Sequence, residues 1–283
     1  MSSITAALVQ LTSSDDMRAN IEAVTALVAE AAGRGATFIV TPETTHLMVT
    51  GREKALSRSF IQDEDPGLKA FCGLAAKHAV WLLIGSLIIR KTTDRLVNRS
   101  FLISPDGTIA AHYDKMHLFD VDLGGGEQYR ESALFDAGST PTLAKTPFGT
   151  IGMSICYDLR FPLLYTLLAR AGASLITIPA AFTVPTGQAH WHTLVRARAI
   201  ETGAYVLAPA QTGLHSTGRQ TYGHSLIVDP WGTILVDAGS EPGVFMAELD
   251  LAKVAAVRQK MPSLGHARPL AEPKIWTGKH DRL

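Results

Sequence analysis

Short apolar segments alternate with segments of helical periodicity along this chain, and that order restricts the folds open to it. Residues 4–11 and 37–41 form the apolar runs that are typical of buried strands. Between them, apolar side chains recur at the spacing of one helix face, at Met17, Ile21, Val24, Val28 and Ala31. A helix that joins two strands packs against their sheet, so this order predicts an α/β protein.

The alternation continues to the end of the chain. Further strands are predicted at residues 80–89, 100–104, 109–113, 150–155, 175–178, 204–209, 225–228, 234–236 and 244–249, and further helices at 68–79, 163–168, 189–200 and 251–260. The turn Pro105-Asp106-Gly107 joins two strands as a hairpin, so we expect a mixed sheet. No linker divides the sequence. We therefore expect a single domain over residues 1–283, with an extended C-terminal arm from about residue 262.

Composition and charge exclude several classes of protein. Hydrophobic residues make up 46% of the chain and charged residues 18%, which is enough for a large core. The 26 basic side chains balance the 26 acidic ones, so the sequence lacks the basic excess of a nucleic-acid binder. The longest strongly apolar run, residues 79–89, is shorter than the roughly 20 residues of a membrane-spanning helix. We expect no nucleic-acid partner and no membrane partner.

The N-terminal residues and the cysteine count indicate a compartment. The first apolar segment has no basic stretch before it and runs into Asp15 and Asp16, which is not typical of a signal peptide. The two cysteines, Cys72 and Cys156, form neither a disulfide framework nor a cysteine-rich zinc site. These features predict a reduced, cytoplasmic protein.

Cys156 lies where a predicted strand ends and a helical pattern begins. At such a turn, backbone N–H groups and the positive end of a helix lower the pKa of a thiol. The N–H of Tyr157 can also point at an oxyanion that forms on a substrate carbonyl. A buried structural cysteine fits the same residue, as it does most isolated cysteines. Cys72, on the apolar side of a predicted helix, is assigned to packing.

Two charged residues follow other predicted strands. Glu43 comes directly after an apolar strand and a proline, and Lys115 follows the strand at residues 109–113. In open α/β sheets, ligands bind outside the carboxyl ends of the strands. Each residue taken singly is an ordinary loop residue, but together with Cys156 they form a candidate constellation.

Histidines offer a second arrangement, because histidine is the usual base for a cysteine nucleophile. Of the ten histidines, His46 and His117 have the most distinctive placements, each beside polar residues after a strand. His190 and His192 are two residues apart in a predicted helix, so their rings point to different faces and make a poor metal site. We expect no metal site.

The sequence resembles the nitrilase superfamily of carbon–nitrogen hydrolases along nearly its whole length, and within it most closely the Nit branch. The resemblance is carried by residues 41–43 (TPE), 113–120 (YDKMHLFD), 152–162 (GMSICYDLRFP), 181–191 (AFTVPTGQAHW), 196–201 (RARAIE) and 222–232 (YGHSLIVDPWG). It implies a four-layer αββα sandwich that assembles into homodimers or larger oligomers. The order and spacing of these blocks make it specific.

The resemblance also implies roles for individual residues. Cys156 matches the nucleophile, Glu43 the general base and Lys115 the residue that stabilises the tetrahedral intermediate. Glu131, sixteen residues after Lys115, matches a second glutamate that is found in this branch. Phe182 and Thr186 match positions that line the pocket in similar proteins.

Substrate recognition is less constrained. The guanidinium of Arg160 fits a substrate carboxylate, and it fits a buried structural ion pair equally well. The Nit branch has His-Trp-Glu where this chain has His190-Trp191-His192, so substrate choice can differ from that of the branch. The run Gly124-Gly125-Gly126 suggests a loop that orders over the site when ligand binds.

We therefore expect a cofactor-free amidase that hydrolyses a small aliphatic, carboxylate-bearing amide to an acid and ammonia through a thioester. A nitrile or an N-carbamoyl amine is an alternative substrate for the same residues. Two further classes are a non-catalytic dimerising interaction module and a thiol-redox protein. The intact Glu43, Lys115 and Cys156 argue against the first, and the absence of a second cysteine near Cys156 argues against the second.

Overall fold

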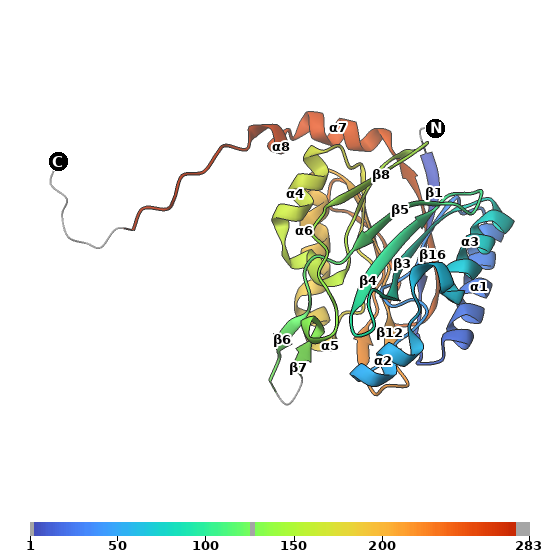
Figure 1. Ribbon diagram of the computed structural model, residues 1–283. Coiled ribbons are helices and arrows are strands. Elements are labelled where there is room, and N and C mark those ends of the chain that lie inside the picture. Colours follow the sequence, from blue (N-terminus) through green and yellow to red (C-terminus); the bar gives the residue numbers. More distant parts are fainter. Residues whose placement is uncertain (1–2, 125–127, 276–283) are drawn as a thin grey trace.

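Two six-stranded sheets pack face to face in the computed structural model, which describes residues 3–124 and 128–275 (Figure 1). The first sheet has the strand order β16 (Gly243–Asp250), β1 (Ser3–Gln10), β2 (Phe38–Val40), β3 (Trp81–Arg90), β4 (Leu96–Ile103) and β5 (Ile109–Asp114). Strands β1, β2 and β3 are parallel, and the other pairings are antiparallel. The mixed sheet predicted from the hairpin turn is therefore confirmed.

The second sheet repeats this plan. Its order is β15 (Ile234–Asp237), β14 (Leu226–Val228), β11 (Tyr205–Ala208), β10 (Leu175–Thr177), β9 (Gly149–Met153) and β8 (Thr142–Thr146). Here β9, β10 and β11 are the parallel strands. Two hairpins lie outside both sheets, β6 (Asp120–Asp122) with β7 (Gln128–Arg130), and β12 (Thr212–Leu214) with β13 (Gln220–Tyr222).

Helices cover the outer face of each sheet. Helices α1 (Met17–Gly33) and α3 (Pro66–His78) lie against the first sheet, and α4 (Pro162–Arg170) and α6 (His192–Thr202) lie against the second (Figure 1). The remaining helices are α2 (Arg52–Arg58), α5 (Val184–Thr186), α7 (Ala252–Lys260) and α8 (Ser263–His266), with 3-10 turns η1 (Gln62–Glu64), η2 (Glu131–Ala133) and η3 (Cys156–Arg160) and a π-helical turn η4 (Gly187–Trp191).

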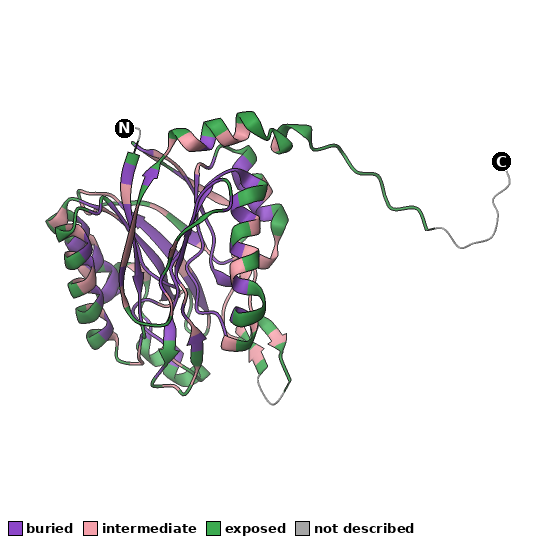
Figure 2. Cartoon of the chain, turned by 180° about the vertical axis from the view of Figure 1, so that it is seen from behind, coloured by how far each residue is buried: buried purple, intermediate pink, exposed green. Residues whose placement is uncertain are grey.

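Apolar packing holds these layers together. One cluster contains residues from both sheets, such as Leu83 of the first and Leu175 of the second, and extends to Leu168 of α4. A second cluster joins the outer side of the first sheet to α1 and α3, through residues such as Val28 and Phe71. Buried residues accordingly fill the strands, while the outer faces of the helices are exposed (Figure 2). The αββα sandwich implied by the resemblance is confirmed.

The helix boundaries follow from local signals. Asp16 caps α1, because its carboxylate accepts hydrogen bonds from Arg18 N (3.0 Å) and Ala19 N (3.1 Å). The helix predicted over residues 189–200 is divided, since η4 precedes α6. The sequence does not predict α2, β8 or the two hairpins, because these short segments have few buried residues and little periodicity.

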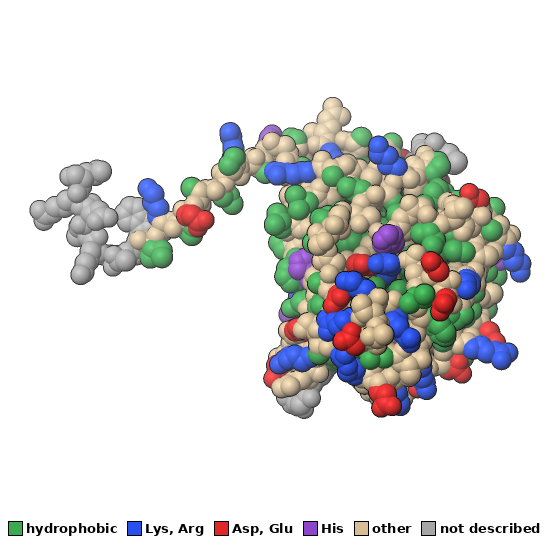
Figure 3. All heavy atoms as spheres, in the orientation of Figure 1, with side chains coloured by type: hydrophobic (Ala, Val, Ile, Leu, Met, Phe, Trp, Pro, Cys, Tyr) green, Lys and Arg blue, Asp and Glu red, His purple; other side chains and the backbone are tan. Residues whose placement is uncertain are grey.

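The charged surface and the C-terminal residues bear on the predictions of partners and of an extended arm. Lys and Arg side chains are interspersed with Asp and Glu on the face seen in Figure 3. Residues 267–275 have no regular structure and run away from the body of the protein (Figure 1).

Of the predicted glycine loop, only Gly124 lies within the described residues; Gly125 and Gly126 lie outside them. Among the helices of the described residues, none has the length and apolar character needed to cross a bilayer.

Gly85 of β3 lies close to the loop after β2 and to Pro179, which follows β10 of the second sheet. This close approach predicts a local sensitivity to side-chain volume. A Cβ at this residue would lie 2.1 Å from Thr41 O and 2.5 Å from Pro179 Cβ. We expect Gly85→Ala to lower the free energy of unfolding by about 1–3 kcal/mol through overpacking. Gly73→Ala in α3 meets nothing within 4 Å and should raise it by up to about 1 kcal/mol. Urea unfolding measures both, and equal stabilities of the two variants would contradict the prediction.

Candidate active site

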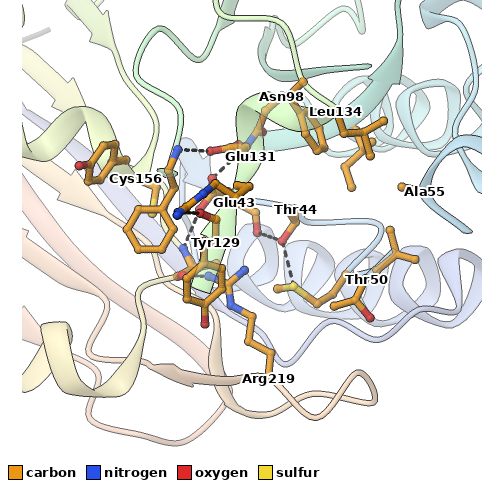
Figure 4. Close-up of a pocket in the computed structure, with 18 of the residues that line it drawn as sticks. Glu43, Thr44, Thr50, Ala55, Asn98, Tyr129, Glu131, Leu134, Cys156 and Arg219 are labelled. Carbon is orange, nitrogen blue, oxygen red and sulfur yellow. Dashed lines mark hydrogen bonds between the residues drawn. The ribbon is translucent and has the colours of Figure 1, made fainter. Parts of the chain in front are cut away.

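The loops that leave the carboxyl ends of strands from both sheets surround one cavity of about 420 Å³. Glu43 follows β2, Lys115 follows β5 and Cys156 follows β9, and all three line this cavity. In Figure 4, Glu43, Glu131 and Cys156 point toward one another. The structure thus brings together side chains that are up to 113 residues apart in the sequence (Glu43 to Cys156).

Lys115 is held between two carboxylates. Its Nζ lies 2.8 Å from Glu43 Oε1 and 2.9 Å from Glu131 Oε2, and its side chain is 2% exposed. Burial by itself lowers the pKa of Lys115, but Glu131 and Glu43 together raise the pKa well above its usual range. Lys115 is therefore an ammonium ion at neutral pH.

Glu43 is fixed by four donors. Burial raises its pKa, but the charge and the hydrogen bond of Lys115, together with Cys156 and Arg219, lower the pKa overall. Glu43 Oε1 also accepts a hydrogen bond from Asn98 Nδ2 (2.9 Å), and Oε2 accepts one from Ala181 N (2.9 Å). The Cys156 thiol donates the fourth hydrogen bond. Glu43 is consequently an ionised carboxylate beside the Cys156 thiol.

Cys156 begins the turn η3 with a positive φ of 48°, a backbone conformation that is uncommon for a residue with a side chain. The position of Cys156 between a strand and a helical pattern predicts a lowered pKa of the thiol, and that prediction is wrong. Burial and the adjacent Glu43 carboxylate raise the pKa of Cys156 well above its usual value, and the opposing effect of Lys115 is smaller. The resting residue is a neutral thiol beside a base.

Asp158 anchors the turn that carries Cys156. Its carboxylate is fully buried and accepts hydrogen bonds from Ile155 N (2.8 Å), Tyr113 Oη (2.8 Å), His117 N (3.0 Å) and the His117 ring at Nδ1 (2.7 Å). His117 is therefore occupied by Asp158, and no histidine is among the described residues that line the cavity. The carboxylate that faces Cys156 is that of Glu43. Among the described residues that line the cavity, Cys156 has no histidine partner.

Of the four residues predicted to bind substrate, three line the cavity and one does not. Tyr157, Phe182 and Thr186 line the cavity. Arg160 is not among the lining residues: its guanidinium lies 5.4 Å from the Phe182 ring centroid, and its Nη2 lies 3.3 Å from His190 Nδ1. Its role toward substrate remains a prediction.

Several residues of the site were missed. Asn98 lies inside an apolar strand, and a polar residue in such a place is a signal that could have been used. Arg219 lies in the loop between β12 and β13, and nothing in its local sequence marks it. The cavity also contains Arg52, Arg130 and Tyr129. The lining carries four cationic side chains and two anionic ones among the described residues, which favours an anionic ligand.

His192, where the resemblance to the Nit branch predicts a glutamate, is not among the residues that line the cavity. Its Nε2 lies 3.0 Å from Asp237 Oδ2. The substitution therefore changes the surroundings of α6 and leaves the described wall of the cavity as it is.

Comparisons with known proteins agree with this geometry. The carbon-nitrogen hydrolase family profile matches residues 5–259. The deaminated glutathione amidase of Synechocystis sp. strain PCC 6803 is 41% identical over 265 residues, which are 92% of this chain and 97% of that protein.

Two solved structures are also similar. The Caenorhabditis elegans NitFhit protein has a TM-score of 0.88 and 35% identity over 95% of this chain and 66% of its own. Saccharomyces cerevisiae Nit3, described as a member of branch 10 of the nitrilase superfamily, has a TM-score of 0.83 and 31% identity over 92% of this chain and 95% of its own.

The fold and the matched profile define the class of protein: the chain belongs to the carbon–nitrogen hydrolase family, the nitrilase superfamily, and is a hydrolase. Within that family it is most similar to proteins of the Nit branch, as the motifs predicted.

Asn98 gives a prediction about pH. Because Glu43 must be ionised to accept a proton and its pKa is lowered, the acid limb of kcat/KM should lie below the usual range of a glutamate. Asn98→Asp adds a carboxylate beside Glu43 and Glu131, raises the pKa of Glu43 and should move the acid limb to higher pH by about one unit or more.

Asn98→Ala is the matched control for this experiment. It removes the same hydrogen bond without adding charge, so its acid limb should move less than that of Asn98→Asp. Rate profiles over the acid range measure both shifts, and coincident profiles for the two variants would contradict the assignment of the limb to Glu43.

Proposed function

We propose that this protein hydrolyses a small aliphatic, carboxylate-bearing amide by covalent catalysis, with Cys156 as the nucleophile. The observation that carries this proposal is the hydrogen-bonded set of Cys156, Glu43 and Lys115 in one cavity. The relatives named deaminated glutathione amidase support an amide as the substrate.

The first half of the reaction forms a thioester. Glu43 takes the proton of the Cys156 thiol while Sγ attacks the amide carbon. The Lys115 ammonium and the N–H of Tyr157 hold the resulting oxyanion. The intermediate then collapses as protonated Glu43 delivers its proton to the departing nitrogen, which leaves as ammonia or an amine.

The second half consumes water. Glu43, again a carboxylate, takes a proton from water, and the hydroxyl oxygen adds to the thioester carbon. Collapse of this second intermediate releases the acid, and the Cys156 thiolate recovers its proton from Glu43. Glu131 acts by keeping Lys115 charged and oriented, and no cofactor is required by any step.

Arg219 is the residue we propose for the substrate carboxylate. It lines the cavity, its guanidinium lies 5.4 Å from the Tyr129 ring centroid, and its Nη2 donates a hydrogen bond to Ala181 O. Its Nε is buried without a hydrogen-bond partner among the described residues. An unsatisfied buried donor on a cation favours an anionic acceptor. Phe182 and Thr186 supply other parts of the wall.

We also propose that the protein is cytoplasmic and forms homodimers or larger homo-oligomers. The free thiols of Cys72 and Cys156 fit a reducing compartment. Leu163 and Leu167 of α4 are 69% and 46% exposed, and Ile200 of α6 is 52% exposed. An outer layer with such apolar side chains favours burial against a second copy.

Cys156→Ala should lower the rate of amide hydrolysis by more than about 10⁴-fold, because no other group can form the thioester. Cys72→Ala is the control, since Cys72 lies in α3 away from the cavity and should retain wild-type activity. Release of ammonia or amine from a panel of ω-amides, nitriles and N-carbamoyl amines measures the effect. A nitrile substrate would pass through a thioimidate, and an N-carbamoyl amine would release carbon dioxide.

This panel separates the classes of function. Activity that survives in Cys156→Ala would rule out the proposed mechanism. Absence of hydrolysis by the wild-type protein across the panel would favour the non-catalytic interaction module. Loss of hydrolysis in Cys72→Ala would favour a role for both thiols, as in thiol-redox chemistry.

Arg219→Gln should raise KM for carboxylate-bearing amides by about 10- to 100-fold, the equivalent of one charged hydrogen bond. Its effect on a neutral amide of the same length should be small. Arg160→Gln, the other predicted carboxylate ligand, is the matched comparison and should change KM little. If Arg160→Gln raises KM and Arg219→Gln does not, the carboxylate site is at Arg160.

A further inference from the structure

Three side chains that can ligate a metal meet outside the cavity. His192 is the first residue of α6, His224 lies between β13 and β14, and Asp237 ends β15. His192 Nε2 lies 3.0 Å from Asp237 Oδ2, and His224 Nδ1 lies 2.8 Å from Asp237 Oδ1. One ligand atom from each residue lies within 4.8 Å of the others. None of the three lines the active-site cavity.

The surrounding structure fixes these side chains. His224 has a left-handed backbone with φ 54°, its N–H donates to Gly239 O (2.7 Å), and its carbonyl accepts from Trp191 Nε1 (2.7 Å). Its ring stacks on Tyr222 at a centroid distance of 4.5 Å. The Gly239 N–H donates to Asp237 Oδ1 (3.0 Å). The cluster is therefore organised before any ligand arrives.

Charge and exposure also suit a cation. Asp237 supplies a carboxylate, and it faces both imidazole rings and the Gly239 N–H. The side chains of His192, His224 and Asp237 are 32%, 28% and 37% exposed, which leaves an open side for water. No lysine or arginine makes an ion pair with Asp237 among the described residues.

The geometry points to a site for a divalent transition-metal ion of the zinc type, bound by His192 Nε2, His224 Nδ1 and a carboxylate oxygen of Asp237. Zinc bonds of about 2.0–2.2 Å place neighbouring ligands of a tetrahedron roughly 3.3 Å apart. The nitrogen–oxygen distances of 3.0 and 2.8 Å, one to each carboxylate oxygen, are near this spacing. The three ligand atoms lie within 4.8 Å of one another, so the side chains must rotate toward each other to hold one ion. Water completes the coordination.

The proton balance is simple. With neutral imidazoles, the nitrogens that face Asp237 carry the protons of the two hydrogen bonds. When the ion binds, each ring presents that nitrogen as a lone-pair donor and carries its proton on the other nitrogen, His192 Nδ1 and His224 Nε2. Two hydrogen bonds to Asp237 are replaced by coordinate bonds, and no redox step is involved.

The pair considered in the sequence, His190 and His192, is not the site. His190 Nδ1 lies 3.3 Å from Arg160 Nη2, so its ring is directed away from Asp237. His192 instead lies beside His224, in the loop before β14, and Asp237, at the end of β15. His190 therefore provides a control residue that is two positions from a proposed ligand.

The test uses Co²⁺ and Zn²⁺ with full-length protein that carries Cys156→Ala, because the active-site thiol could otherwise bind either ion. In this parent, Co²⁺ should produce the visible d–d bands of a four- or five-coordinate nitrogen–oxygen site, without a thiolate charge-transfer band. His192→Gln, His224→Asn and Asp237→Asn should each weaken binding by more than about tenfold. His190→Gln should bind as the parent does.

The replacements at residues 224 and 237 are chosen to preserve the local backbone and side-chain shape. Asparagine tolerates the left-handed backbone at residue 224, and Asp237→Asn keeps the side-chain shape. Thermal unfolding with a chelator checks each variant, and Zn²⁺ should then raise the unfolding midpoint of the parent and of His190→Gln only. A parent that binds neither ion, a thiolate band, or variants that bind as tightly as the parent would each overturn the proposal.

Discussion

The buried ammonium of Lys115 is the charge on which the arrangement of the site depends. A lone cation that is 2% exposed would be strongly destabilised, so Lys115 requires its carboxylate partners, Glu43 and Glu131. These partners come from loops after different strands, and their attraction to one ion draws those loops together. Asn98 adds a neutral donor to both carboxylates, at 2.9 Å from Glu43 and 3.3 Å from Glu131.

The same charges explain why the thiol is protonated at rest. Burial disfavours a Cys156 thiolate, and the adjacent Glu43 carboxylate raises the pKa of the thiol further than the Lys115 ammonium lowers it. Catalysis by such a site depends on proton transfer in step with attack, so the distance and orientation of Glu43 matter more than a low thiol pKa. The hydrogen bonds from Asn98 and Ala181 serve that orientation.

The sandwich provides rigid supports for this chemistry. Glu43, Asn98 and Lys115 come from the first sheet, while Cys156 and Ala181 come from the second. Asp158, which anchors the Cys156 turn, accepts a hydrogen bond from Tyr113 of β5 in the opposite sheet. The two halves of the site therefore keep their spacing because the sheets are packed together, and the absence of a side chain at Gly85 lets Pro179 of the second half approach the first sheet closely.

The sequence by itself determined the order of strands and helices, since hydrophobic periodicity is local, and it placed Glu43, Lys115 and Cys156 after strand ends. Motif resemblance added Glu131 and the sandwich. Only the tertiary structure decided the protonation of Cys156, because that depends on burial and on Glu43, 113 residues away. It also decided that Arg219 lines the cavity while Arg160 does not, and that His192 meets His224 and Asp237, since these contacts join segments with no shared local pattern.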